Sequence, residues 1–262
     1  MNKIKGLLLL IIAIVFTFCQ SSKYVSVEED SSANSEKKRV FTENIKWNSL
    51  KQPVFSDPDD DFAKDPSIFY ADGKYYMYYT GSATGFQGHG TPNWQIEYAT
   101  SSDGLNWKKQ GVIFKADSNT WEAGRVQAPS RPIWYDGKYY MFYTGGPRKP
   151  KNLIYTSYAT STDLVNWTKS NEIIPQNIGR ANDIFIYEEE DIFYMFYTTY
   201  KEKNEPIFMR KSSDLVNWSE PEPTGAGGEG SVLWKEKGRY YMLGCHGWSS
   251  TTEVYRYMFQ LS

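Results

Sequence analysis

One phrase occurs four times along this chain of 262 residues: a polar start, a tight turn and a short strand rich in aromatic residues. The copies begin at Asp65, Ala128, Ala181 and Glu229, and the first reads DPSIFYADGKYYMYYTGS. A second phrase follows each of the first three copies, and its first occurrence is YATSSDGLNWKK from Tyr98. Repeats spaced by roughly 40–50 residues, each holding one small sheet, are typical of a β-propeller. We therefore predict an all-β chain folded as a β-propeller of four-stranded blades.

Within the first unit the pattern predicts four strands, over residues 67–70, 74–80, 95–100 and 106–114. The dipeptide Asp72-Gly73 between the first two strands favours a hairpin. The first and third connections of each unit are short, whereas the second connection and the link to the next unit are long. These long connections meet on one rim, where we expect the functional site, because long loops on a rigid scaffold commonly carry binding and catalytic residues.

The last unit lacks its fourth strand, because the chain ends after residues 253–261, which have the pattern of a third strand. Residues 46–55 resemble the fourth-strand phrase at residues 105–114. We therefore expect the segment 46–55 to pair with 253–261 and to complete the last blade. Four blade units are recognisable, and the sequence leaves open whether they close the ring or whether a fifth blade is missing at the C-terminus.

The N-terminal 19 residues have the pattern of an export signal. Lys3 and Lys5 precede an apolar run over residues 7–18, and Cys19 follows directly. The run is too short to span a bilayer, and the pattern resembles a bacterial lipoprotein signal, in which the cysteine carries the lipid. Ordinary secretion and an uncleaved anchor are the alternatives. We expect an exported protein, periplasmic or on the cell surface, with a lipid anchor on Cys19, a flexible tether over 20–43 and a catalytic propeller over 44–262.

Composition argues for sugars and against nucleic acid as the partner. The formal net charge is −2, and the chain holds 21 Tyr and 9 Trp, which offer flat faces to sugar rings. The two histidines, His89 and His246, are far apart in sequence and make a poor zinc site. We predict no metal site and no cofactor, and we leave open a structural cation in the central cavity.

Three of the four repeats carry an acid where the innermost strand begins. These acids are Asp65, Asp183 and Glu229. Acids at the heads of innermost strands face one another across the central cavity of a propeller. The alternative is that they cap backbone groups or form ion pairs with Arg125, Arg180 or Lys64.

The acids and their neighbours resemble those of glycoside hydrolase family 43 and its five-bladed relatives, which include arabinanases, β-xylosidases and arabinofuranosidases. Members open the first blade with an Asp-Pro general base, place a second Asp at the head of a middle blade, and carry a Glu-Gly or Glu-Ala-Pro general acid. The resemblance implies that Asp65 is the base, that Asp183 tunes and orients the acid, and that Glu229 is the acid. The three residues match this pattern in identity, order and repeat register. The phrase DLVNW, at residues 163–167 and 214–218, also resembles the family.

Two motifs depart from the family pattern. Family members show Ala-Pro-Asp where this chain has Ala128-Pro129-Ser130, and Ile184 follows the middle Asp in place of proline.

The predicted activity is hydrolysis of glycosidic bonds in polysaccharides or oligosaccharides, with inversion, for which the two catalytic carboxyls stand about 6.5–9.5 Å apart. Six residues on the expected functional rim are predicted to bind the substrate: Trp94, Trp121, Arg125, Arg180, His89 and Trp248.

Two other functions fit the sequence less well. The first is a retaining, fructan-type propeller hydrolase, in which the first Asp is the nucleophile. Such enzymes show Asn-Asp-Pro-Asn, Arg-Asp-Pro and Glu-Cys, whereas this chain has Lys64-Asp65-Pro66-Ser67 and Glu229-Gly230. The second is a non-catalytic surface lipoprotein that binds glycans.

Overall fold

The computed structural model describes residues 53–59, 62–83, 93–122, 124–146, 154–170, 172–174, 181–199, 206–246 and 253–259. The chain divides into two units, residues 1–50 and 51–262, and all described residues belong to the second. Their regular structure consists of strands. In this described part we find no helix long and apolar enough to cross a membrane.

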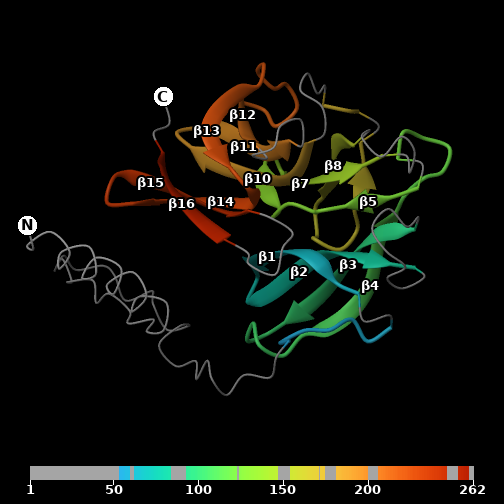
Figure 1. Cartoon of the computed structure of the whole chain (residues 1–262). Helices are drawn as coiled ribbons and strands as arrows, with labels where there is room; N and C mark the ends of the chain where they lie inside the picture. Colours follow the sequence, from blue (N-terminus) through green and yellow to red (C-terminus); the bar gives the residue numbers. More distant parts are fainter. Residues whose placement is uncertain are drawn as a thin grey trace, which may run out of the picture. The chain divides into compact units, whose positions relative to one another are not determined.

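The described strands form four antiparallel sheets, one for each repeat, which confirms the predicted all-β propeller (Figure 1). The first blade comprises β1 (Lys64–Ala71), β2 (Lys74–Ser82), β3 (Trp94–Ser101) and β4 (Lys108–Lys115). The second comprises β5 (Val126–Gln127), β6 (Ile133–Tyr135), β7 (Lys138–Gly145), β8 (Tyr155–Ser161) and β9 (Thr168–Lys169). The third comprises β10 (Ala181–Glu189), β11 (Ile192–Thr199), β12 (Pro206–Ser212) and β13 (Glu222–Gly227). The fourth comprises β14 (Glu229–Glu236), β15 (Arg239–His246) and β16 (Glu253–Phe259).

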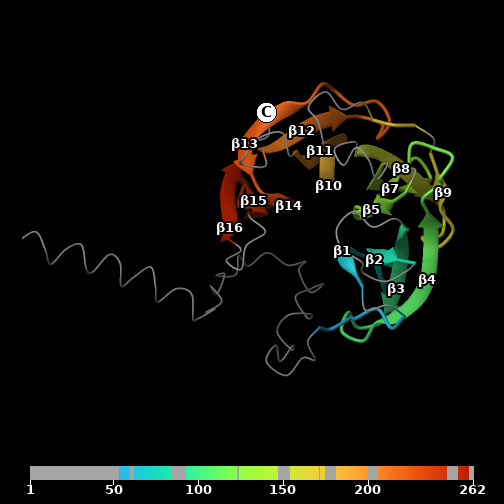
Figure 2. The same ribbon diagram turned by 45° about the vertical axis from the view of Figure 1, so that its right-hand side comes forward.

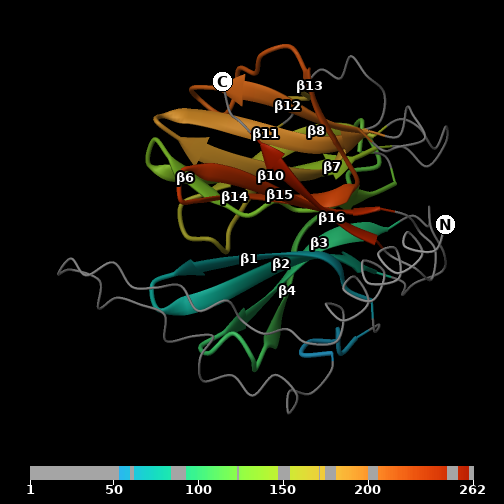
Figure 3. The ribbon, with the colours of Figure 1, turned by 60° about the vertical axis from the view of Figure 1, so that its left-hand side comes forward.

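The sheets stand around a common centre. In Figure 2, β1, β5, β10 and β14 lie nearest that centre, and β4 and β9 lie on the outside. Figure 3 shows the long strands of the first and third sheets from the side. The first strand of every blade is therefore the one that reaches the axis, as the repeats predict.

Three of the four described apolar clusters are each shared by two neighbouring blades, because each sheet buries one face against the next, and the fourth lies on the first blade. The first and second blades share Tyr78 and Met141, and the second and third share Phe142 and Met195. The DLVNW turns contribute to the same clusters: Leu164 and Leu215 are buried, and the Leu164 carbonyl accepts a hydrogen bond from the Tyr78 hydroxyl (2.8 Å). The aromatic strands thus bind the blades to one another.

The aspartate of each DLVNW turn fixes the turn through its carboxylate. In the third blade, Oδ1 of Asp214 accepts hydrogen bonds from the backbone amides of Val216 (2.9 Å) and Asn217 (2.7 Å). Burial raises the pKa of Asp214, but these bonds and the one from the Asn217 side chain lower it by more than burial raises it. The resulting pKa is about 2. These aspartates have a structural role as turn residues.

The predicted completion of the last blade is only partly within the described residues. In this part of the chain the fourth sheet has three strands, β14-β15-β16. Residues 46–52 lie outside the described residues. At the end of the segment, Phe55 packs its ring against Tyr79 of the first blade, with centroids 5.3 Å apart. Phe55 therefore covers a face of the first blade, while the pairing of residues 46–55 with 253–261 stays a prediction.

The outward face of the fourth blade differs from the same face of the other blades. Leu243 of β15 occupies the register position of Tyr78, Phe142 and Phe196, because each stands two residues before the second-strand residue that pairs with the head of the innermost strand. These three aromatic residues are 0% exposed, whereas Leu243 is 38% exposed. In the described structure the following blade buries this position in the first three sheets, and no described residue does so in the fourth.

Candidate active site

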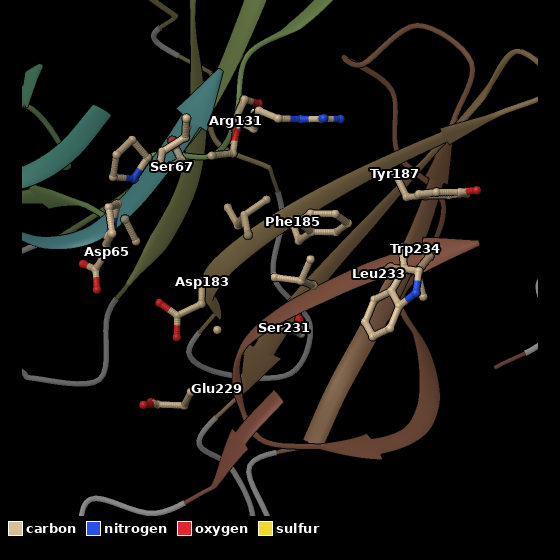
Figure 4. A pocket seen from close by; sticks show the side chains of 18 of the residues that line it. Asp65, Ser67, Arg131, Asp183, Phe185, Tyr187, Glu229, Ser231, Leu233 and Trp234 are labelled. Carbon is tan, nitrogen blue, oxygen red and sulfur yellow. Dashed lines mark hydrogen bonds between the residues drawn. The ribbon is translucent and has the colours of Figure 1, made fainter. Parts of the chain in front are cut away.

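A cavity of about 860 Å³ lies among the innermost strands of all four blades (Figure 4). It is lined by residues 65–68, 128–131, 183–185 with 187, and 229–235. Asp65, Asp183 and Glu229 are all among them, and in Figure 4 their carboxyl groups point to the same side. The structure therefore brings the three predicted acids together, while their catalytic roles stay a prediction.

A β-bulge presents each aspartate to the cavity. In β1, Lys64 pairs with Thr80 and Ser67 with Tyr78, so two residues of β1 stand opposite one residue of β2. Asp65 lies in this bulge with φ 52°, a left-handed conformation that is costly for a residue with a side chain. A bulge bends the strand and redirects the side chain, which is why bulges are common beside active sites.

The same bulge recurs in β10 and β14, but with a different residue at its left-handed position. In β10 this residue is Asp183, with φ 53°, the counterpart of Asp65. In β14, Glu229 is the last paired residue before the bulge, and Gly230 takes the left-handed position with φ 60°. The predicted common register of the three acids is therefore wrong by one residue for Glu229. The extra methylene of glutamate lets its carboxyl reach the same cavity from one position earlier.

Threonines at the ends of the second strands link each blade to the first strand of the next. The Thr80 hydroxyl donates to Oδ2 of Asp65 (2.9 Å) and accepts from the backbone amide of Ala128 (2.8 Å). Thr144 donates to Asn182 beside the third-blade bulge (3.3 Å), and Thr198 donates to the carbonyl of Gly228 (3.0 Å). These bonds hold the heads of the innermost strands at fixed positions around the cavity.

Asp65 also has a cationic neighbour. Nζ of Lys64 lies 2.5 Å from Oδ2 of Asp65 and 4.5 Å from the centre of the Trp94 ring. Trp94, a predicted substrate platform, is only 3% exposed and does not line the cavity. Its ring contacts Phe62, with centroids 5.8 Å apart, and the guanidinium of Arg125 lies 5.9 Å from it. The Trp94 ring therefore contacts the cationic side chains of Lys64 and Arg125.

The other predicted substrate residues fall into two groups. Trp121 and Arg125 are described but do not line the cavity: Trp121 packs on Tyr143, with ring centroids 6.1 Å apart, and Arg125 is buried. The remaining predicted residues, whose side chains lie outside the described part of the chain, are His89, Arg180 and Trp248. Among the described residues no group of three or more His, Cys, Asp or Glu side chains could hold a metal ion.

Sequence reasoning missed Trp234, which lines the cavity on β14 (Figure 4). One face of its indole stacks on Tyr241, with centroids 5.5 Å apart and 21° between the rings, and the side chain is 36% exposed. Arg131 and Tyr187 line the cavity as well. The structure shows that exposed and buried residues alternate along β14, which places Trp234 on an exposed side of the strand. In the sequence alone, Trp234 cannot be told from the other aromatic residues of the strands.

A family profile matches most of the chain. Residues 55–248 match the profile described as "Glycosyl hydrolases family 32 N-terminal domain". The chain belongs to this family. The predicted likeness to propeller glycoside hydrolases such as family 43 is confirmed by the solved structures.

Curated relatives are distant and longer than this chain. A 1,2-β-oligomannan phosphorylase from Thermoanaerobacter is 24% identical over 158 residues, which are 60% of this chain and 51% of that protein. A levanbiose-producing levanase from Bacillus subtilis is 40% identical over 58 residues, which are 22% of this chain and 11% of that protein. The chain therefore spans about half the length of the first relative and a small part of the second.

Solved structures share the fold at low identity. A family 117 glycoside hydrolase from Zobellia galactanivorans superposes with a TM-score of 0.62 at 18% identity, over 74% of this chain and 66% of that one. An endo-arabinase from Bacteroides thetaiotaomicron gives 0.59 at 17% identity, over 74% of each chain. The family 32 β-fructofuranosidase of Bombyx mori gives 0.59 at 20% identity, over 76% of this chain and 46% of that one.

Proposed function

We propose that this chain is a glycosidase that hydrolyses O-glycosidic bonds with Asp65, Asp183 and Glu229. The observation that carries the proposal is the convergence of these acids, from three blades, on one cavity in a family of glycosyl hydrolases. Glycoside hydrolysis needs one carboxyl to protonate the leaving oxygen and one carboxylate to deliver the nucleophile. Three acids on a rigid ring of strands supply this pair together with a neighbour, and the reaction needs no cofactor.

In the proposed mechanism Glu229 is the general acid and Asp183 orients it. Asp65 has one of two roles. The family match favours a nucleophile that forms a covalent glycosyl intermediate, with overall retention of the anomeric configuration. The departure of Lys64-Asp65-Pro66-Ser67 from the fructan-type motif favours a general base that activates water, with inversion. We propose fructan-type oligosaccharides as the first substrates to test, because the profile and a levanase relative both point to them.

The activity test is a panel of substrates with matched variants. Levan, inulin, arabinan, mannan and xylan oligosaccharides are compared with activated aryl glycosides, with and without inorganic phosphate, because one relative is a phosphorylase. Glu229→Gln should lower turnover of natural linkages by about 10²–10⁴-fold and of aryl glycosides much less, since an activated leaving group needs no proton. Asp65→Asn should lower both alike. Two controls should keep parental turnover: Glu236→Gln, on the same strand but outside the cavity lining, and Asp72→Asn, in the turn that follows β1.

Two results would contradict the assignment. Equal losses on both substrate types in Glu229→Gln would reject Glu229 as the acid. Sugar binding without any turnover in the parent protein would instead indicate a non-catalytic glycan-binding lipoprotein. Adding methanol separates the two roles of Asp65. A methyl glycoside of retained configuration would show that Asp65 forms a covalent intermediate as the nucleophile, whereas an inverted product with no such methyl glycoside would show that Asp65 is the general base.

We also propose that the protein is exported and anchored to the membrane by a lipid on Cys19. Lys3, Lys5 and the apolar run of residues 7–18 support this proposal. Metabolic labelling with a fatty-acid probe should mark the parent chain and leave Cys19→Ser unmarked. Labelling of both chains, or of neither, would contradict the anchor.

A further inference from the structure

We infer that Lys64 is a positioning residue that holds one oxygen of Asp65 and leaves the other as the reacting atom. The inference rests on the proposed function, in which Asp65 is the nucleophile or the base. It assigns to Lys64 a role that the fructan-type motif gives to no cation, since that motif has asparagine before the aspartate. Three features of the described structure support it: the carboxylate contacts, the aromatic support of the ammonium, and the residues at the same position in the other blades.

The contacts of Asp65 are all on one oxygen. Oδ2 receives the Lys64 ammonium at 2.5 Å and the Thr80 hydroxyl at 2.9 Å. No described residue donates a hydrogen bond to Oδ1. The Asp65 side chain is 26% exposed, so a substrate or water can reach it from the cavity. A carboxylate held in this way presents Oδ1 in one orientation.

The lysine is itself held in place. Lysine is a point charge on a flexible four-carbon stem, so it orients a partner only where something restricts it. Its ammonium lies 4.5 Å from the centre of the Trp94 ring, within the range of a cation–π contact. Trp94 is 3% exposed and packs against Phe62, so the ring is a rigid support. Trp94 therefore acts on Asp65 through Lys64.

The other blades show that the fold does not require a cation here. Lys64 pairs with Thr80 at the end of the second strand of its blade. The residues that occupy the same position in the second, third and fourth blades are Gln127, Asn182 and Glu229. Gln127 and Asn182 bond to each other across two blades (2.9 Å). Of the four described blades, only the first combines a cation at this position with an aspartate at the left-handed position. A charge-assisted hydrogen bond is shorter and stronger than the neutral bond an amide would make.

The chemistry explains why a fixed Oδ2 would matter. If Asp65 is the nucleophile, Oδ1 bonds to the anomeric carbon while the glycosidic C–O bond breaks and the leaving oxygen takes the proton of Glu229. If Asp65 is the base, Oδ1 accepts a proton from the water whose oxygen bonds to that carbon. In both cases Oδ1 has to be aligned with a reacting atom, and a displacement of about 1 Å can cost about 10²-fold in rate.

The test compares Lys64→Met, Lys64→Arg and a control, Lys74→Met. Lys74 also lies over a ring, 5.1 Å from the centre of Tyr76, whereas the ammonium that bonds to Asp65 is that of Lys64. Lys64→Met should lower kcat by about 10–100-fold with little change in KM, because it disturbs alignment rather than binding. Lys64→Arg should recover most of the loss, and Lys74→Met should match the parent. Unchanged kcat in Lys64→Met, or equal loss in the arginine variant, would overturn the inference.

A double variant and a crystal structure keep the test independent of the proposed function. If Trp94 acts through Lys64, adding Trp94→Leu to Lys64→Met should lower kcat no further; an additive loss would overturn that link. Should the parent hydrolyse none of the substrates, the proposed function fails, and crystal structures of the parent and Lys64→Met still decide on positioning. The Asp65 carboxylate should turn in the variant, and an unchanged carboxylate would overturn the inference.

Discussion

Replacing Lys109 by methionine should destabilise the protein strongly, because its ammonium compensates two buried carboxylates. Nζ of Lys109 lies 2.6 Å from Oδ1 of Asp57 and 2.6 Å from Oε2 of Glu97. The two acid side chains are 0% and 1% exposed, and Lys109 itself is 13% exposed. The Tyr79 hydroxyl donates to Asp57 (2.7 Å), and the Gln95 amide donates to Glu97 (2.6 Å). Lys109→Met would leave the buried carboxylates of Asp57 and Glu97 without this ammonium to balance their negative charge.

The expected loss follows from the burial of the group. Removing one partner of a buried ion pair costs about 3–5 kcal/mol, which for a domain of this size lowers the melting temperature by about 6–20 °C. Burial already raises the pKa of Glu97, and loss of the ammonium would raise it further. A carboxyl whose folded pKa lies above its unfolded value loses stability as the pH rises between the two values. The deficit of Lys109→Met should therefore be larger at pH 8 than at pH 5.

Thermal and urea unfolding at both pH values, followed by tryptophan fluorescence, measures this effect. Lys108→Met is the matched control, because Lys108 precedes Lys109 on β4 and its side chain is exposed. It should unfold within about 0.5 kcal/mol of the parent, as most surface substitutions do. Equal stability of the two variants, or a deficit of Lys109→Met that does not shrink at pH 5, would refute the reasoning.

Three further predictions concern the core, the cavity and a turn. Gly81→Ala should cost about 1–3 kcal/mol in denaturant unfolding, because its Cβ would stand 2.4 Å from Oε1 of Glu97; a parental midpoint would contradict this. Trp234→Ala should raise KM for long oligosaccharides about tenfold, or about 1.4 kcal/mol, while Trp134→Ala, an exposed indole outside the cavity, should not; equal values would remove Trp234 from the binding surface. Asp214→Ala should lower the melting temperature at pH 7, and the deficit should vanish as the pH falls from about 4 to about 2, because the folded pKa of about 2 lies below the unfolded value; a constant deficit would mean that the charge is unimportant.

The repeats were sufficient to predict the blades and the acids at their centre. The predicted strand over 74–80 is β2 (Lys74–Ser82), and the predicted strand over 95–100 is β3 (Trp94–Ser101). Both succeed because a hairpin dipeptide and a run of aromatic residues are local signals. Asp65 and Asp183 could be found because the repeats align them, and aligned heads of innermost strands have to meet at the axis.

The details of the site depended on signals that sequence does not carry. The offset of Glu229 from the other acids arises from a bulge, and a bulge adds one residue without changing the composition around it. Trp94 was expected to be a sugar platform, but Lys64 and Arg125 cover its ring. The Asp57–Lys109 pair joins residues 52 positions apart, so only the folded chain brings them together.

The exposed Leu243 has a consequence for the order in which the protein loses its structure. A sheet that buries only one face and has three described strands opens at a lower free energy than its neighbours, which bury both faces. The fourth blade carries Glu229 on β14. Gentle heating should therefore remove the proposed acid from the cavity while the first three blades are still folded, so that inactivation comes before melting. Amide exchange should be fastest in β16, and any partner or longer chain that covers Leu243 would preserve activity to a higher temperature without touching the acids.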